Sequence, residues 1–342
     1  MSQSRIRDLH VYTNESGSNV ELPSSSTRYR IVEAAIHLAL SLLESPQGRR
    51  SLVDVSKAIL DNAGQRGHIY RDSLDNLPAW IDRFLKSIRN DCPGVYIDTT
   101  VKGEAYARRV NWGNDMQKYE AGQAVTIYIH NVLIDNMVYS RQHPEITENS
   151  YEMFKFQLGL VLAHEIIHCL TGFLLGTTSD TPPNVTLDRY GDTKKGEAGR
   201  MWEKRLLGGV VEMWSSPQDG LGKRQAGTPY LFDGGRQHAI GRRVSVEYIN
   251  NFIKEGFSFP IATSIEAPAT TRTQLSKEQS KETSALRTKR SMKNAPAASS
   301  PPPGASSSST SYRRLPIESQ ATASQAYQET VSQRNQKTYD RR

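Results

Sequence analysis

The stretch Ala163–Cys169, AHEIIHC, holds the residue types best suited to chemistry in this chain. His164 and His168 are four residues apart, so on a helix they lie on one face and both imidazoles can bind one metal ion. Glu165 lies about 100° around the helix from His164. At that offset its carboxylate is not a ligand, but it can act as a general base towards a water at the ion. Imidazole and carboxylate ligands with one open position are typical of catalytic zinc, so the stretch predicts a Zn2+ site.

A chance match is the alternative, in which two structural histidines share one helix by accident. The motif lies in the middle of residues 156–176, FQLGLVLAHEIIHCLTGFLLG, which are apolar almost throughout. Two histidines and a glutamate buried there need partners, because unpaired polar groups are costly in an apolar environment, and a metal ion supplies one. The segment is also long enough to cross a membrane, but charged side chains at its centre disfavour that. We therefore expect a buried helix with a metal site, and no membrane.

The third metal ligand is less clearly marked. Glu197, in GEAGRMWE, begins a predicted helix 29 residues after His168, and a helix holds a carboxylate ligand rigidly. The alternative is that Glu197 is a first-turn glutamate that the helix dipole stabilises. The other candidate ligands after the motif are four carboxylates and one imidazole: Asp188, Asp192, Glu203, Glu212 and His238.

An HExxH motif followed by a glutamate on the next helix resembles the gluzincin branch of the zincin metallopeptidases, with the thermolysin-like arrangement. The resemblance covers roughly residues 120–215. It implies that His164, His168 and Glu197 hold zinc and that Glu165 is the general base. The chain is also similar to uncharacterised fungal proteins that carry the same pair of HExxH and GExGR motifs.

The family's chemistry further implies a donor for the oxyanion of the tetrahedral intermediate, and a strand that receives the substrate. Tyr190, seven residues before Glu197, and His238 are the candidate donors. The segment 124–130, AVTIYIH, alternates apolar and polar residues and predicts a strand. By the resemblance, this strand is an edge strand that pairs with an extended peptide substrate.

Hydrophobic periodicity along the chain predicts an α+β fold. Ser26 or Thr27 is expected to cap the first helix, and Ser51 the second. The predicted helices are 29–44, 51–64, 73–91, 151–176 and 196–209, and the predicted strands are 94–101, 124–130 and 210–214.

Composition divides the chain into four parts. Residues 1–25 are polar and predict a flexible N-terminus, and residues 26–92 predict a helical region. Residues 93–260 contain the motif and predict a zincin-like catalytic domain, with a small sheet packed on the HExxH helix. After Pro260 the chain is rich in Ser, Thr, Ala, Pro and Gln, which bury too little apolar surface to fold, so 261–342 predict a disordered basic tail.

Charge and cysteine content restrict the partners and the compartment. The tail contains 13 Lys and Arg against 6 Asp and Glu, which is the whole net charge of +7. The remainder is neutral and disfavours a nucleic-acid partner. Two cysteines, Cys92 and Cys169, suit a reducing compartment, and the first residues lack the apolar segment of a secretory signal. We therefore expect an intracellular protein, cytoplasmic or alternatively nuclear.

These observations together predict a zinc-dependent hydrolase, with a metallopeptidase as the favoured kind and a peptide or small amide as substrate. One alternative is a zinc enzyme that hydrolyses a non-peptide amide or ester in small-molecule metabolism. A second alternative is a non-catalytic binding protein that retains the metal site. Glu165 argues against the second, because a structural zinc site needs no base and usually has four protein ligands.

Overall fold

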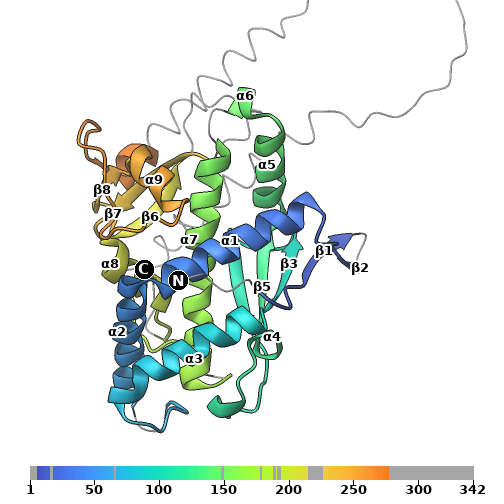
Figure 1. The fold of residues 1–342 in the computed structure, drawn as a ribbon. Helices are drawn as coiled ribbons and strands as arrows, with labels where there is room; N and C mark the ends of the chain where they lie inside the picture. The colour runs from blue at the N-terminus through green and yellow to red at the C-terminus, as the bar shows by residue number, and fades with distance from the viewer. Residues whose placement is uncertain are drawn as a thin grey trace, which may run out of the picture.

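A long helix, α7 (Ser150–Leu175), lies between two β-sheets in the computed structural model of the chain (Figure 1). The chain combines runs of consecutive helices, such as α5 (Asn131–Gln142) to α8 (Ala198–Leu207), with sheets that contain antiparallel strands, so the predicted α+β class is confirmed. The structure describes residues 6–15, 18–64, 67–147, 150–177, 179–187, 190, 194–214 and 226–276.

The first sheet has five strands in the order β2-β1-β3-β5-β4. The three central strands are parallel, whereas β2 and β4 are antiparallel to their neighbours. Burial alternates along β3 and β5, as expected of a sheet with one face on the core. The bounds are Val11–Glu15 (β1), Ser18–Glu21 (β2), Gly94–Asp98 (β3), Ala105–Arg109 (β4) and Val125–His130 (β5).

The strand expected at the edge of this sheet lies inside it. Val125–His130 forms the predicted strand, but β3 and β4 flank it on both sides. The edge-strand prediction is therefore wrong, and the edge on that side is β4. The sequence of Ala105–Arg109, AYARR, lacks the apolar alternation by which strands are predicted.

Helices cover the inner face of this sheet and pack on α7 (Figure 1). The first is capped by Ser26 as predicted, since its hydroxyl accepts a hydrogen bond from Tyr29 N, and it begins two residues earlier than predicted, at Thr27. The second begins at Pro46 and is capped by Ser45, so the predicted cap at Ser51 is wrong. Ser51 is buried inside the helix and accepts a hydrogen bond from Trp202 Nε1. The helices are α1 (Thr27–Glu44), α2 (Pro46–Ala63), α3 (Leu77–Asn90) and α5 (Asn131–Gln142), with the short turns η1 (Leu74–Asn76), η2 (Met116–Lys118), α4 (Ala121–Ala124) and α6 (Pro144–Thr147).

The apolar character of α7 is explained by its surroundings. It contacts α1, α2, α5, α8, α9 and β4. Among the described residues it is the one helix long and apolar enough to span a membrane, yet 83% of its most apolar window is buried against the rest of the protein.

The second sheet lies on the other side of α7, in the order β6-β7-β8-β9 with antiparallel pairs throughout (Figure 1). Helix α8 leads directly into it. Gly208 ends α8 with φ 85°, as the predicted glycine stop requires. The elements are α8 (Ala198–Leu207), β6 (Val210–Trp214), β7 (Thr228–Phe232), β8 (Ile240–Arg243), α9 (Val246–Phe252) and β9 (Thr270–Thr271).

One hydrophobic core crosses the predicted domain boundaries. It contains Ile6, Leu9 and Val11 from the N-terminal segment, together with side chains from the helices of residues 26–92 and from α7. The prediction of a flexible N-terminus is therefore wrong for residues 6–15. Residues 26–92 contain the helices α1, α2 and α3, and these helices share their core with the rest of the protein. Pairing of β1 with β3 is a contact between distant residues, which local sequence patterns do not show.

The predicted tail begins too early. Residues 261–276 contain the buried Ile261, the strand β9 and Arg272, whose side chain is 2% exposed. Residues 277–342 lie outside the described part of the chain, so their predicted disorder stays a prediction.

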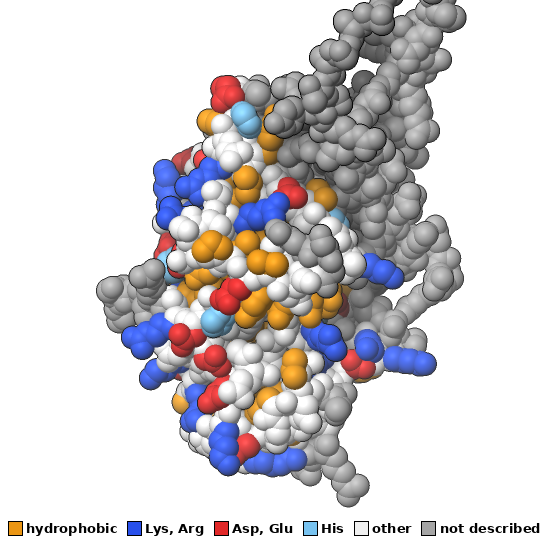
Figure 2. All heavy atoms as spheres, turned by 90° about the vertical axis from the view of Figure 1, so that its right-hand side faces the viewer, with side chains coloured by type: hydrophobic (Ala, Val, Ile, Leu, Met, Phe, Trp, Pro, Cys, Tyr) orange, Lys and Arg blue, Asp and Glu red, His pale blue; other side chains and the backbone are white. Residues whose placement is uncertain are grey.

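Charge on the face shown in Figure 2 is mixed rather than segregated. On the face shown in Figure 2, acidic and basic side chains are interspersed, with hydrophobic side chains between them. A face that binds a nucleic-acid backbone presents mainly positive charge. This face does not have that character.

We expect a chain ending at residue 276 to be clearly more stable than one ending at residue 260. The longer chain keeps the ion pair of Arg272 with Glu212, whose side chains are 2% and 9% exposed. Removing Arg272 leaves a buried carboxylate without its partner, which costs about 3–5 kcal/mol. Thermal unfolding of both truncated chains and the full chain measures the difference. Equal melting temperatures for all three would contradict the docking of residues 261–276.

Candidate metal centre

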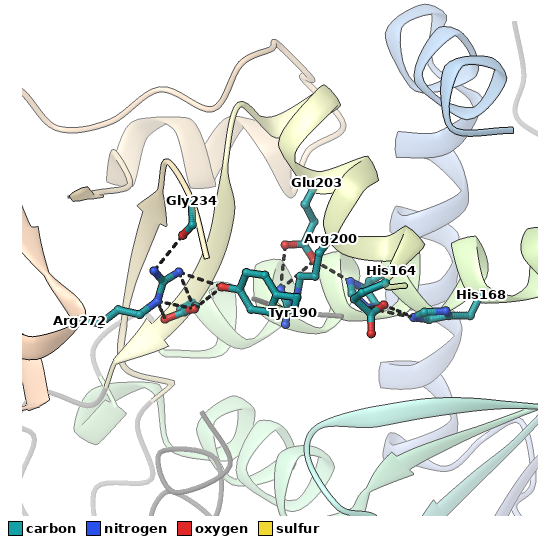
Figure 3. Close-up of polar contacts among 9 residues, drawn as sticks. His164, His168, Tyr190, Arg200, Glu203, Gly234 and Arg272 are labelled. Atoms are coloured by element: carbon teal, nitrogen blue, oxygen red, sulfur yellow. Dashed lines mark hydrogen bonds and ion pairs between the residues drawn. The ribbon is translucent and has the colours of Figure 1, made fainter. Parts of the chain in front are cut away.

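Three ligand atoms converge between α7 and α8 (Figure 3). They belong to His164, His168 and Glu197, and we call these three residues the metal group. Glu197 Oε1 lies 2.7 Å from His168 Nε2 and 3.3 Å from His164 Nε2. The two imidazole Nε2 atoms are 3.2 Å apart. Zinc bonds of about 2.0–2.1 Å in tetrahedral geometry put neighbouring ligand atoms about 3.3 Å apart. Two of the three separations match this value and the third is somewhat shorter, so the group has the dimensions of a zinc site.

The Glu197 carboxylate is oriented as a ligand and not as a helix cap. It occupies the N-cap position of α8, which begins two residues after the predicted start at residue 196, and it makes no side-chain hydrogen bond to that helix. Its Oε1 atom is buried and makes no hydrogen bond of normal geometry among the described residues. Its contacts are with the two imidazole Nε2 atoms, and a cation at the centre of the group would bind all three ligand atoms. This orientation favours the ligand role over the helix-dipole alternative.

The backbone before α8 fixes the position of Glu197. Its N–H donates to Val185 O at 2.8 Å, and the Gly196 N–H donates to Thr181 O at 2.9 Å. A Cβ at Gly196 would overlap the carbonyl oxygens of Pro182 and Val185. Glycine is therefore required for this close approach.

A second carboxylate orients the first histidine (Figure 3). His164 Nδ1 lies 2.6 Å from Glu203 Oε1, so the imidazole donates from Nδ1 and directs Nε2 to the metal group. Arg200 Nη1 donates to both oxygens of Glu203, at 3.0 and 2.8 Å. A Cβ at Gly199 would overlap the His164 ring, so this glycine allows α8 to lie against the imidazole.

Neighbouring charges favour a cation at this point. Burial alone would lower the pKa of His164, but its bonds to Glu197 and Glu203 outweigh burial and raise that pKa to about 10. Burial would raise the pKa of Glu197, but the two histidines hold it well below its usual range. Burial would also raise the pKa of Glu203, and Arg200 and His164 lower it. The two carboxylates thus favour positive charge at His164, and a metal ion bound at its Nε2 would have to displace a proton from the ring.

The expected general base lies at the edge of the first sheet. Glu165 is 8% exposed, and its Oε2 accepts a hydrogen bond from Ala107 N of β4 at 2.7 Å. The carboxylate therefore sits beside the backbone of the edge strand.

The sequence does not mark Glu104 as part of this region. Its carboxyl is hydrogen-bonded to the Gln157 amide of α7. Burial raises the pKa of Glu104, and the nearby positive charges of Arg200 and His164 offset this only in part. An acid with a raised pKa close to other charged groups is a common functional element, but spacing in the sequence gives no signal for it.

The remaining predicted residues lie elsewhere or have other partners. The Tyr190 hydroxyl donates to Glu212 Oε1 at 2.9 Å and accepts from Arg272, facing away from the metal group (Figure 3). Glu212 is thus engaged with Arg272 and is not a ligand. His238 is exposed in the turn between β7 and β8, and no described contact joins it to the group. Glu203 contacts Nδ1 of His164 and not the ligand atom Nε2. Asp188 and Asp192 lie outside the described residues.

Comparison of the chain with protein-family models, with curated proteins and with solved structures gives no match in any of the three. The comparisons therefore assign no family. The zincin resemblance stays a prediction, and the geometry of the site supplies the argument for function.

We expect Glu203→Gln to weaken zinc binding by about 10- to 100-fold, because His164 loses the carboxylate that orients it. Zinc affinity measured by competition with a chromophoric chelator tests this. Arg205→Gln, an exposed position on the same helix, is the matched control and should bind zinc like the unmodified chain. Unchanged affinity in a correctly folded Glu203→Gln variant would contradict the orienting role.

Proposed function

We propose that this protein is a zinc-dependent hydrolase, and that its substrates are peptides. The observation that carries the proposal is the convergence of three ligand atoms, at 2.7–3.3 Å from one another, beside a carboxylate that contacts an open strand edge. When bound at such a group, zinc lowers the pKa of a coordinated water and polarises a substrate carbonyl.

Each residue of the group has a distinct task in this proposal. His164, His168 and Glu197 hold the ion, and Glu203 orients His164. Glu165 accepts a proton from the attacking water as the water oxygen bonds to the carbonyl carbon. It then passes the proton to the leaving amine nitrogen as the C–N bond breaks. The products are a carboxylic acid and an amine, so no other reactant is required.

The position of Glu165 favours a peptide over a small amide or ester. The carboxylate lies on the backbone of β4, which has β5 on one side and no further described strand on the other. An open strand edge binds extended peptides through main-chain hydrogen bonds. A bound peptide would therefore pass directly beside the base.

Two further proposals concern the setting of the reaction. Cys92 and Cys169 are both free and buried, which is consistent with an intracellular, reducing compartment. The interspersed charge of the face in Figure 2 supports a partner other than nucleic acid.

We expect the purified protein to hold about one zinc ion per chain, and His164→Ala or His168→Ala to abolish this. Elemental analysis of the three proteins measures the zinc content. Full zinc content in both variants would contradict the metal site itself.

We expect Glu165→Gln and Glu197→Gln to have different effects on zinc binding and on peptide hydrolysis. The Glu165 variant should keep zinc and lose about two or more orders of magnitude in peptide hydrolysis, because an amide cannot accept the proton. The Glu197 variant loses an anionic ligand, so its zinc affinity should fall. Zinc content and hydrolysis of a peptide library are measured on both. If Glu165→Gln loses zinc while Glu197→Gln keeps both zinc and activity, the two roles are assigned wrongly.

A further inference from the structure

Four tyrosines form a row across the outer face of the first sheet. Strand register places them directly opposite one another, from β1 through β3 and β5 to β4. Successive ring centroids are 4.7, 5.3 and 4.7 Å apart, with interplanar angles of 20°, 24° and 7°. We call this set the tyrosine row; in order it is Tyr12, Tyr96, Tyr128 and Tyr106.

The row is closed at one end and open at the other. Beyond Tyr12 lie the ring of His10, stacked at 6.4 Å, and the strand β2. At the other end, Tyr106 stands on β4, the last described strand of the sheet, and is 41% exposed. One face of its ring stacks on Tyr128, so the opposite face is directed beyond the edge of the sheet.

The same edge offers peptide groups that are not paired with another described strand. Glu104 O accepts from His130 N, and Val110 N donates to Ala124 O, so alternate residues from 104 to 110 bond to β5. The peptide groups of Ala105, Ala107 and Arg109 therefore point away from β5. The contact of Ala107 N with Glu165 agrees with this direction and places the base at the same edge.

A peptide strand paired with this edge would put one side chain directly opposite Tyr106. Directly opposite side chains on one face of a sheet have Cβ atoms about 4.5–5.5 Å apart. An aromatic side chain at that position would stack on the open face of Tyr106 and continue the row. Tyr106 precedes Ala107, so this side chain belongs to a residue close to the peptide bond beside Glu165.

Arg108 gives rise to a second side-chain preference. It concerns the peptide position opposite Arg108, two residues away from the position opposite Tyr106. Arg108 lies on the same outer face, is exposed, and pairs across the sheet with the uncharged Thr126. Among the described residues no carboxylate forms an ion pair with it. Opposite charges in directly opposed cross-strand positions attract each other, so an acidic side chain is favoured there.

We propose that the substrate is an extended peptide that pairs with β4 and carries an aromatic side chain opposite Tyr106 and an acidic side chain two residues away, opposite Arg108. This proposal rests on the proposed function and specifies its substrate class. An antiparallel peptide places the acidic residue before the aromatic one, and a parallel peptide reverses the order.

Binding to the full-length, zinc-loaded Glu165→Gln variant tests the preference without turnover. The probes are fluorescein-labelled peptides Ala-Ala-Glu-Ala-Tyr-Ala-Ala and Ala-Ala-Tyr-Ala-Glu-Ala-Ala, with counterparts in which Tyr or Glu is replaced by Ala. Fluorescence anisotropy gives their Kd values. In one of the two orders, we expect Tyr to improve binding about 2- to 10-fold over Ala, and Glu to improve it by a smaller factor.

Additional substitutions assign the preference to its residues. Tyr106→Val should remove the preference for Tyr, Tyr106→Phe should keep it, and Arg108→Gln should remove the preference for Glu. Tyr12→Val, at the closed end of the row, is the matched control and should leave both preferences unchanged. Melting temperatures confirm that each variant is folded.

The outcomes separate this inference from the proposed function. Peptides that are cleaved by the active protein but bound equally with Tyr or Ala would overturn the inference and leave the peptidase proposal standing. A preference for Tyr that survives Tyr106→Val would also overturn it. No binding of any probe, together with no cleavage of a peptide library by the zinc-loaded protein, would overturn both.

Discussion

An almost wholly apolar helix carries three polar side chains near its midpoint, one buried and two partly buried, and the surrounding structure is arranged to pair them. Helix α7 places His164, Glu165 and His168 against the core, where a lone charge is costly. Helix α8 supplies the opposite charges at 2.6–3.3 Å. That approach requires Gly199, because any Cβ there would occupy the space of the imidazole ring. The packing of α8 on α7 is thus fixed by electrostatics and by the absence of one side chain.

Charge pairing extends from this point into the second sheet (Figure 3). Glu203, which orients His164, is neutralised by Arg200, and the Arg200 guanidinium lies 5.0 Å from the centre of the Tyr190 ring. The Tyr190 hydroxyl meets Arg272, whose guanidinium also binds two carbonyl oxygens of the turn after β7 at 2.8 Å. Each charged side chain in this series has an oppositely charged or an aromatic partner, so the charges nearly cancel. Residues far along the sequence therefore help to hold the metal group in place.

Local sequence patterns predict what local interactions determine. The strand Val210–Trp214 and the glycine that ends α8 follow from periodicity and backbone freedom alone. The HExxH pair is likewise a consequence of helix geometry. The two N-terminal strands and the edge position of β4 depend on pairing between distant residues, and composition cannot report them. The boundary at residue 261 is wrong for a similar reason: one buried arginine, Arg272, ties a polar segment to the core. The roles of Gly199, Arg200 and Glu203 require the approach of α8 to α7, which no spacing in the sequence specifies.

In the proposed function, the edge strand β4 would connect substrate recognition to chemistry, because its residues alternate between two directions. Its odd-numbered residues direct their side chains to the inner face and their peptide groups to the open edge, where Ala107 contacts Glu165. Its even-numbered residues, Tyr106 and Arg108, face outward and continue the tyrosine row. Because side chains alternate with a period of two, a paired peptide would be in one fixed register with both features. A slip by one residue would turn its aromatic side chain away from Tyr106, and a slip by two would move a different peptide bond beside Glu165. Selection of a side chain on one face would thereby select the bond that reaches the base.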